Sequence, residues 1–445
     1  MGINQTPGRM LLRGLEILSM EPGSEPTRGS IRIDDGRITA IGTLTADEDE
    51  ETLDLAGLTA LPGFVQGHVH LCQTLFRGRA EDLALLEWLE RRIWPLEAAH
   101  DEESLRVSAR IGLAELARGG CTTFQSMETT HGTEFVFDEV LRSGQRAVIG
   151  NAMMDSGGGK LSRSTAEVLD TSLRLKAEWD GRKDRIHYAF NPRFLLSCSK
   201  DLLTELGRIR ASERCRIHTH AAEHPKELDQ VLSKHGKPTL LALADLDLLG
   251  ETTSLAHCVH LSDEEMSVLE ESRSAVLHCP TTNLKLGSGI APVSRYLEAG
   301  IRVAIGSDGA PANNRLDALT ELRQAALLAQ LESGPGSLTP RQALEMLTIE
   351  GARALGLEER IGSLAPGKEA DLVIMDLGGP FLQGDVHSRI VYAADRSHIR
   401  HVLSAGAFLV RDGSLLGELA DSVKLQRESD QAIERLVKRA AVHST

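Results

Sequence analysis

The chain has 445 residues, of which 41% are apolar and 25% charged, and a formal net charge of −15 at pH 7. This length exceeds what one ordinary core serves, so we expect two domains or one large barrel with an appendage. The acidic balance excludes a general nucleic-acid partner, and no apolar run approaches the ~20 residues that cross a bilayer, so we also expect no membrane partner.

The first residues, "MGINQTPGRMLLRG", lack the apolar segment of a signal peptide. The six cysteines are scattered without CxxC spacing. This usage is typical of small buried residues in a reducing compartment and not of a disulfide framework. We therefore expect a cytoplasmic protein.

Both ends of the chain have β character. Residues 29–44, "GSIRIDDGRITAIGTL", alternate apolar and polar residues around a "DDGR" turn, which predicts a β-hairpin. The pattern returns in "ADLVIMDL" at 370–377 and in "IRHVLSAGAFLVRDGSLL" at 399–416. Because chain ends often lie close together, we predict one small β-sandwich domain made of residues 1–62 and 363–445, the second part also carrying a terminal helix.

Between these ends, short apolar runs alternate with helical patterns such as "DEESLRVSARIGLAELARG" and "RLDALTELRQAALLAQL". The eight runs are "GFVQGHVH", "CTTFQSM", "RAVIGNAMM", "RIHYAFNPR", "CRIHTHAAE", "SLAHCV", "SAVLHCP" and "RVAIGSDG". Strand alternating with helix predicts a parallel sheet. Eight runs over about 300 residues predict an α/β protein with a (β/α)8 TIM-type barrel, which we assign to residues 63–362.

In such a barrel, chemistry occurs at the carboxyl ends of the strands. Polar residues stand where four of the apolar runs stop: His68, His70, His220, His257 and Asp308. Side chains alternate along a strand, so His68 and His70 face the same side. Imidazole nitrogens and a carboxylate oxygen are ligands that zinc takes, with one position left for water. Convergence at four strand ends predicts a metal site, whereas His218, His260 and His278 are interpreted as packing or hydrogen-bonding residues.

The segments "GHVH", "HTHAAE", "AHCVH" and "GSDG" resemble the amidohydrolase superfamily, and within it the purine-deaminase and triazine-hydrolase branch. "LPGFVQGHVH" and "IGSLAPGKEADLVIMD" match the same branch, so the resemblance covers nearly the whole chain. It implies one Zn²⁺ per chain, or Fe²⁺ as in some relatives, bound by His68, His70, His220 and Asp308. The fourth run contains no lysine, which argues against a hydantoinase-like hydrolase with two bridged metals.

The resemblance also implies a mechanism. A metal-activated water attacks a ring carbon that bears an amino group, and the ring nitrogen and the departing amine need protons. Glu223, three residues after His220, is expected to carry protons. Asp308 can take the proton of the attacking water, and His257 can hydrogen-bond that water. We therefore predict a hydrolytic deaminase whose partners are a small heterocyclic amine and water. A binding protein on the same scaffold is disfavoured because the ligand set is complete.

Two groups of relatives compete for the substrate. "HCPTTNLKLGSGIAPV", "GSDGAPANN" and "WPLE" resemble methylthioadenosine/S-adenosylhomocysteine deaminases, in which the glutamate matching Glu97 holds ribose hydroxyls. "LLEWL", "QRAVIGNAMMD" and "NPRFLLSCS" resemble guanine deaminases. The adenosine-type enzymes usually end the fourth run with a histidine motif and carry an arginine in the third run. Here Arg193 follows the proline of the fourth run and Asn151 stands in the third.

The predicted substrate-binding residues are Gln73, Trp88, Glu97, Asn151, Arg193 and Phe194. A guanidinium donates to a ring carbonyl and nitrogen in a fixed fork, an amide both donates and accepts, and aromatic rings form flat walls. Trp88 could instead be core, and Arg193 could pair with an acid such as Glu128. We predict a guanine-like or pterin-like oxo-amino ring first, an adenosine-type substrate second and an s-triazine third. We also expect the protein to form a homo-oligomer, namely a homodimer.

Overall fold

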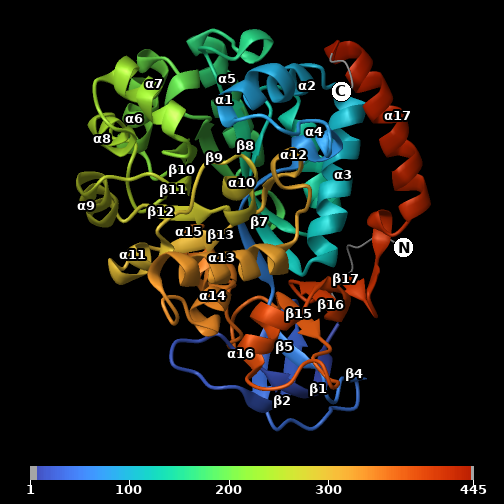
Figure 1. The fold of residues 1–445 in the computed structure, drawn as a ribbon. Coiled ribbons are helices and arrows are strands. Elements are labelled where there is room, and N and C mark those ends of the chain that lie inside the picture. Colours follow the sequence, from blue (N-terminus) through green and yellow to red (C-terminus); the bar gives the residue numbers. More distant parts are fainter. Residues whose placement is uncertain (1–7, 442–445) are drawn as a thin grey trace.

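The computed structural model describes residues 8–441 of the chain. The expectation about a signal peptide rests largely on residues 1–7, which lie outside the described residues. Two sheets organise the molecule: a parallel sheet surrounded by helices, and a smaller mixed sheet at one end of it (Figure 1). This arrangement confirms the predicted TIM-type barrel with an added β-domain.

The barrel strands coincide with the eight predicted apolar runs. They are β6 (Phe64–His70), β7 (Cys121–Glu128), β8 (Arg146–Met153), β9 (Ile186–Pro192), β10 (Arg216–Ala221), β11 (Thr253–His257), β12 (Ala275–His278) and β13 (Val303–Ile305), followed by the short β14 (Asp308–Gly309). Neighbours along the chain pair in parallel, from β6 through to β13. The barrel closes because β14, three residues beyond β13, pairs with β6, with Asp308 opposite Val69. Closure therefore brings the carboxyl ends of all the strands to one mouth.

Helices connect the strands and cover the outside of the barrel (Figure 1). The main ones are α3 (Glu102–Arg118), α4 (Thr133–Ser143), α5 (Thr165–Trp179), α6 (Lys200–Ser212), α7 (Pro225–His235), α8 (Thr239–Asp245), α9 (Asp263–Ser272), α10 (Pro280–Lys285), α11 (Val293–Glu298), α12 (Ala310–Asn313), α13 (Ala318–Ser333), α14 (Pro340–Leu347) and α15 (Ile349–Ala354). Both helical segments singled out in the sequence form helices, α3 and α13. Each begins after an aspartate that accepts backbone N–H groups, Asp101 for α3 and Asp317 for α13.

Short helices lie above the barrel mouth, between β6 and α3. They are η1 (Leu71–Phe76), α1 (Leu85–Trp88), η2 (Leu89–Ile93) and α2 (Trp94–Ala98). Their apolar side chains form a satellite core that includes Trp88 and Phe194. The C-terminal helix α17 (Ser422–Ala440) runs along α3 (Figure 1) and adds Ala432 and Leu436 to this satellite core. The C-terminal helix therefore packs against the short helices that cover the barrel mouth.

The smaller sheet contains strands from both ends of the chain. These are β1 (Met10–Ile17), β2 (Thr27–Asp34), β3 (Arg37–Gly42), β4 (Glu51–Asp54), β5 (Thr59–Pro62), β15 (Leu372–Met375), β16 (Ile399–Ser404), β17 (Ala407–Arg411) and β18 (Ser414–Leu415). The two halves join where β5 pairs antiparallel with β15, Leu61 opposite Val373. The predicted "DDGR" turn joins β2 to β3, with Asp35 and Gly36 both at positive φ, as a tight hairpin turn requires. The domain limits at 62 and 363 stay predictions.

A buried ion cluster joins the two sheets. Arg146, at the start of β8, is fully buried, and its guanidinium donates to Asp371 at 2.8 Å and to Glu369. Both carboxylates lie just before β15. Charged residues are almost never fully buried without partners, so these contacts fix how the barrel and the small sheet meet.

The structure also bears on the expectations about membrane-spanning segments and cysteines. Among residues 8–441, no helix combines the length and the apolar character needed to cross a membrane. The six cysteines are all buried and unpaired.

Candidate metal centre and active site

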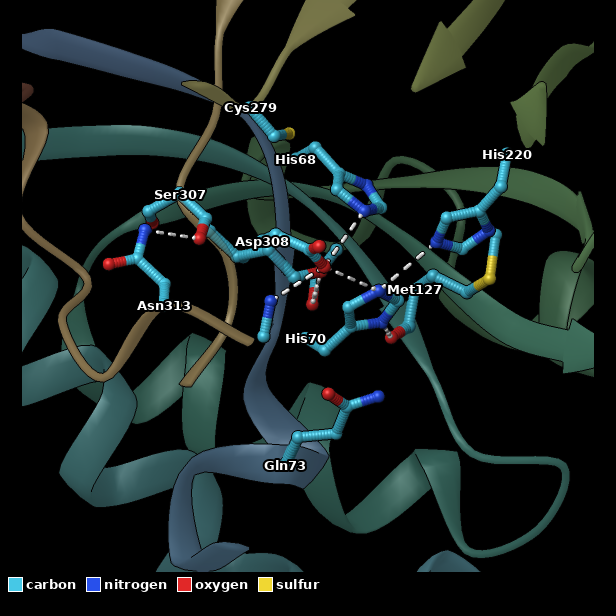
Figure 2. A network of polar contacts seen from close by, with 12 residues as sticks. His68, His70, Gln73, Met127, His220, Cys279, Ser307, Asp308 and Asn313 are labelled. Atoms are coloured by element: carbon cyan, nitrogen blue, oxygen red, sulfur yellow. Dashed lines mark hydrogen bonds and ion pairs between the residues drawn. The ribbon is translucent and has the colours of Figure 1, made fainter. Parts of the chain in front are cut away.

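Four of the predicted residues converge at the barrel mouth. His68 and His70 come from β6, His220 from β10 and Asp308 from β14, and their ligand atoms all lie within 4.8 Å of one another. Figure 2 shows the three imidazoles and the carboxylate pointing toward one another. The structure therefore brings together the full set predicted as metal ligands.

The contacts inside this group are close. Nε2 of His70 lies 3.2 Å from Oδ1 of Asp308 and 3.3 Å from Nε2 of His220. Nε2 of His68 lies 3.3 Å from the same carboxylate oxygen. Each of these atoms can serve as a metal ligand, and they surround one point.

The hydrogen bonds made by the Nδ1 atoms determine whether each Nε2 has a lone pair for a metal ion. Nδ1 of His70 lies 2.6 Å from the carbonyl of Met127, and Nδ1 of His220 lies 2.7 Å from the carbonyl of Arg193. A carbonyl only accepts, so both Nδ1 atoms donate, and in the neutral rings each Nε2 carries a lone pair. Lone pairs that face a carboxylate oxygen repel it unless a cation lies between them. The donor set therefore fits a divalent metal ion with N and O ligands, and the carbonyls fix the ring orientations.

His68 is held by another histidine. Its Nδ1 lies 2.8 Å from Nε2 of His218, a residue interpreted from the sequence as packing or hydrogen-bonding and not as a ligand. Burial lowers the pKa of His68 to about 4 and that of His218 well below its usual value. Neutral imidazoles are the form that binds metals.

Glu223 and His257 lie beside the ligand group. Oε2 of Glu223 is 3.5 Å from Nε2 of His257, and its Oε1 accepts a hydrogen bond from Ser288 at 3.4 Å. Nδ1 of His257 lies 2.9 Å from Oδ1 of Asn283, so it donates there and leaves Nε2 as an acceptor. Burial, with the charge of Asp308, raises the pKa of Glu223 well above its usual value. A raised pKa favours the protonated form of a carboxyl group, the form that acts as an acid.

Backbone conformation at the mouth is unusual. His257 and Asp308 have φ values of 75° and 60°, and Ala222, next to Glu223, has 51°. Such conformations are uncommon outside glycine, and they cluster at functional sites. Here they turn the chain at the strand ends that carry the reactive side chains.

A cavity adjoins this centre. Besides His70, His220, Glu223, His257 and Asp308, its walls contain Gln73, Leu85, Trp88, Leu89, Arg193, Phe194, Glu227 and Leu286. Four of the six residues predicted to bind substrate therefore line it, namely Gln73, Trp88, Arg193 and Phe194. Most of the remaining wall is apolar, which suits a flat ring.

Arg193 is engaged differently from the expectation. It forms a bidentate ion pair with Glu97, in which Nη1 lies 2.6 Å from Oε2 and Nη2 lies 3.0 Å from Oε1. The side-chain amide of Gln73 donates to the same carboxylate at 2.8 Å. The acid is Glu97 and not Glu128, which accepts instead from the backbone N–H of Cys72. Much of the guanidinium's donor capacity is thus already used within the protein.

Glu97 and Asn151 do not line the cavity. Glu97 is turned toward Arg193 and Gln73. Asn151 bonds to Tyr188 at 2.7 Å and to Ser172 of α5. Alternation explains this, because Ile149 and Met153, two residues to either side on β8, pack in the core under the helices and share the face of Asn151. The prediction for Asn151 rested on the resemblance, because the adenosine-type enzymes carry an arginine in this run.

Three polar residues at the site were not predicted: Asn283 and Ser288, which contact His257 and Glu223, and Glu227 in the cavity wall. The first two lie in "HCPTTNLKLGSGIAPV", a segment already noted for its resemblance. Glu227, in the first turn of α7, lies four residues after Glu223 and accepts its backbone N–H at 2.8 Å. The spacing of the two glutamates was the available signal.

Known proteins resemble this chain over most of its length. A sequence model of the amidohydrolase family matches residues 59–409. The chain is 37% identical to the 5-methylthioadenosine/S-adenosylhomocysteine deaminase of Moorella thermoacetica, over 92% of this chain and 95% of that protein. It is 34% identical to the 5′-deoxyadenosine deaminase of Methanosarcina mazei, over 97% of this chain and 99% of that one. The crystal structure of an adenosine deaminase from Xanthomonas campestris with bound zinc has a TM-score of 0.90 and 30% identity, covering 97% and 99% of the two chains.

Proposed function

The chain belongs to the amidohydrolase family, is a hydrolase of C–N bonds, and, we propose, removes the amino group of an adenosine-type purine as ammonia. The observation that carries the proposal is the complete His–His–His–Asp group with the carboxyl group of Glu223 beside it, 3.5 Å from His257. The relatives favour the adenosine-type substrate, which was the second choice from sequence, over the guanine-like ring. The ion pair of Arg193 weakens the main argument for a ring carbonyl.

We propose one Zn²⁺ per chain, with Fe²⁺ as the alternative, held by His68, His70, His220 and Asp308. The bound cation would supply a water molecule acidic enough to attack a ring carbon near neutral pH. His257 orients this water, because its Nε2 has a free lone pair once Nδ1 donates to Asn283. A cytoplasmic homo-oligomer stays a prediction from the sequence.

The protons can be moved by two carboxyl groups. Glu223 donates its proton to the ring nitrogen as the carbon becomes tetrahedral, while Asp308 accepts the proton of the attacking water. Asp308 then gives that proton to the amino group, which leaves as ammonia. Glu223 finally recovers a proton from the new hydroxyl group, which becomes the carbonyl. Both carboxyl groups return to their starting states, so the cycle is balanced.

The test is ammonia release by the zinc-loaded protein with adenosine, methylthioadenosine, 5′-deoxyadenosine, guanine, a pterin and melamine. We expect the highest kcat/KM for an adenosine-type compound. A wide preference for guanine or a pterin would restore the first prediction from the sequence, which Gln73 and Arg193 in the cavity wall still support.

A further inference from the structure

A second cavity lies at the amino ends of the barrel strands, opposite the metal centre. Its volume of about 320 Å³ is on the scale of small-molecule sites, which measure about 300–1,000 Å³. The walls come from β7, β8, the starts of β10 and β11, the residue before β13 and the end of α15. We call it the amino-end cavity and define it by Gln125, Val148, Arg216, Ser254, Arg302 and Leu355.

Polar side chains point into the barrel at this end. Arg216 and His218 are two residues apart on β10, so they share the interior face on which His218 meets His68. Gln125 of β7 reaches β11, where its Oε1 accepts from the hydroxyl group of Ser254 at 3.0 Å. Barrel interiors are normally packed with branched apolar side chains. An arginine and a glutamine at these positions therefore need polar partners.

Arg216 has few partners within the protein. Its guanidinium donates from Nε to the carbonyl of Leu355 at 3.3 Å, and no carboxylate among residues 8–441 forms an ion pair with it. Burial lowers the pKa of Arg216 below its usual value, although the charge of Asp180 offsets part of this effect. At Arg146, by contrast, two carboxylates outweigh burial and raise the pKa. The described residues thus leave both Nη groups of Arg216 without an acceptor.

The side-chain amide of Gln125 is a second unused donor. The residue is 1% exposed, and its Oε1 is occupied by Ser254, but none of the residues described by the structure accepts from its Nε2. A buried N–H group without an acceptor is costly. The guanidinium of Arg302 is different, because it already donates to three carbonyls, those of Glu251, Arg273 and Arg353. The unused donors are therefore those of Arg216 and Gln125.

The charge of the wall also favours an anion. Two carboxylates are present, and that of Glu251 is 60% exposed and lies 3.9 Å from Arg214 at the rim. Three arginines face these two glutamates, Glu251 and Glu358, in a chain whose net charge is −15. The cavity is thus a locally positive place on an acidic protein, and its free hydrogen-bonding groups are donors.

We propose that the amino-end cavity binds a phosphate or sulfate group through the guanidinium of Arg216 and the amide of Gln125. A guanidinium presents its N–H groups to an oxyanion in a fixed fork, and hydrogen bonds to a charged group are stronger than neutral ones. The free inorganic ion and a phosphate monoester share this chemistry, and the volume admits either. The site does not depend on the proposed deaminase reaction, because the metal ligands lie at the other end of the strands.

The experiment is thermal unfolding of the full, metal-loaded chain against phosphate concentration, with the ionic strength kept constant by sodium chloride. Wild type, Arg216→Met and Arg214→Met are compared. Arg214→Met is the matched control, since it removes one positive charge from the rim of the same cavity at a side chain that is 79% exposed. A ligand at a hundred times its Kd should raise Tm by about 3 °C for a chain of this length. We expect this rise in the wild type and in Arg214→Met, and no such rise in Arg216→Met.

The comparison between variants separates this site from other effects of phosphate. Phosphate that coordinates the metal, or that stabilises the protein by exclusion from its surface, acts on all three proteins alike. An equal rise in all three, or no rise in any, would overturn the proposal. Loss of the response in both variants would overturn it too, because the effect would then follow the net charge of this face.

Gln125→Glu gives an independent test, which applies even if Arg216→Met does not fold. The variant keeps an acceptor for Ser254 and places a carboxylate oxygen where the amide nitrogen was. We expect it to abolish the phosphate-dependent rise in Tm, and a rise of wild-type size would contradict the proposal. Titration with glycerol 3-phosphate in place of inorganic phosphate identifies the source of the group: the form that gives the half-maximal rise at the lower concentration is the preferred ligand.

Discussion

Replacing Arg146 tests the junction between the barrel and the small sheet. In Arg146→Met, the buried Asp371 loses the cation 2.8 Å away and keeps the N–H of Ala405 at 2.7 Å. Glu369 keeps Arg360, whose Nε lies 2.7 Å away. Removing one partner of a buried pair lowers the free energy of unfolding by about 3–5 kcal/mol. Because only Asp371 loses its cation, we expect the lower end of that range, about 3 kcal/mol.

This value converts to a melting shift. An unfolding entropy of about 2.1 cal/mol/K per residue gives about 0.9 kcal/mol/K for a chain of 445 residues, so Tm should fall by about 3 °C. The assay is thermal unfolding followed by circular dichroism. Arg142→Met is the control, because Arg142 is 52% exposed and its pair with Asp138 at 3.2 Å should contribute less than about 1 kcal/mol.

A double variant, Arg146→Met with Asp371→Leu, should regain most of the loss, since no buried charge is then left unpaired. The reasoning is refuted if Arg146→Met lowers Tm no more than Arg142→Met. It is also refuted if the double variant is less stable than the single one.

Three further predictions concern the site and its surroundings. Elemental analysis of the purified protein should find about one zinc or iron per chain, and two tightly bound metals would contradict the single His–His–His–Asp centre. Glu223→Gln should keep the metal and lose kcat by about a hundredfold or more, since the amide cannot carry a proton; near-normal turnover would exclude that role. Burial raises the pKa of Glu321 from 4.5 to about 7, so the folded state holds this proton more tightly than the unfolded chain. The free energy of unfolding should therefore fall by up to about 3 kcal/mol as pH rises from about 5 to 8. Glu321→Gln should flatten that dependence in unfolding measurements across the range, and an equally steep fall in the variant would count against the assignment.

The ligand group was accessible from sequence because its signals are local. Period-two alternation marks each strand, and a polar residue where an apolar run stops marks the barrel mouth. Residues two apart on a strand lie on the same face, which explains why His68 and His70 point to the same side. The same rule, applied at β8, places Asn151 on the helix side with Ile149 and Met153.

Contacts between segments that follow different strands could not be predicted from such local patterns. Glu97 and Arg193 are separated by 96 residues and follow different strands, so no local pattern shows that they pair. The guanine-like prediction assumed a free guanidinium at Arg193. The sequence suggested that His218 packs or forms a hydrogen bond, but nothing in "HTH" identifies His68 as its partner.

The pairing of β5 with β15 has a consequence for biosynthesis. Pro62 lies opposite Leu372, so an edge strand near the start of the chain waits for a partner about 310 residues downstream. At about 5–20 residues per second, translation needs roughly 15–60 seconds to supply it. During that interval the ladder groups of β5 are unpaired on this side, and such edges recruit strands from other chains. We therefore expect the nascent protein to be most exposed to aggregation before the C-terminal strands leave the ribosome.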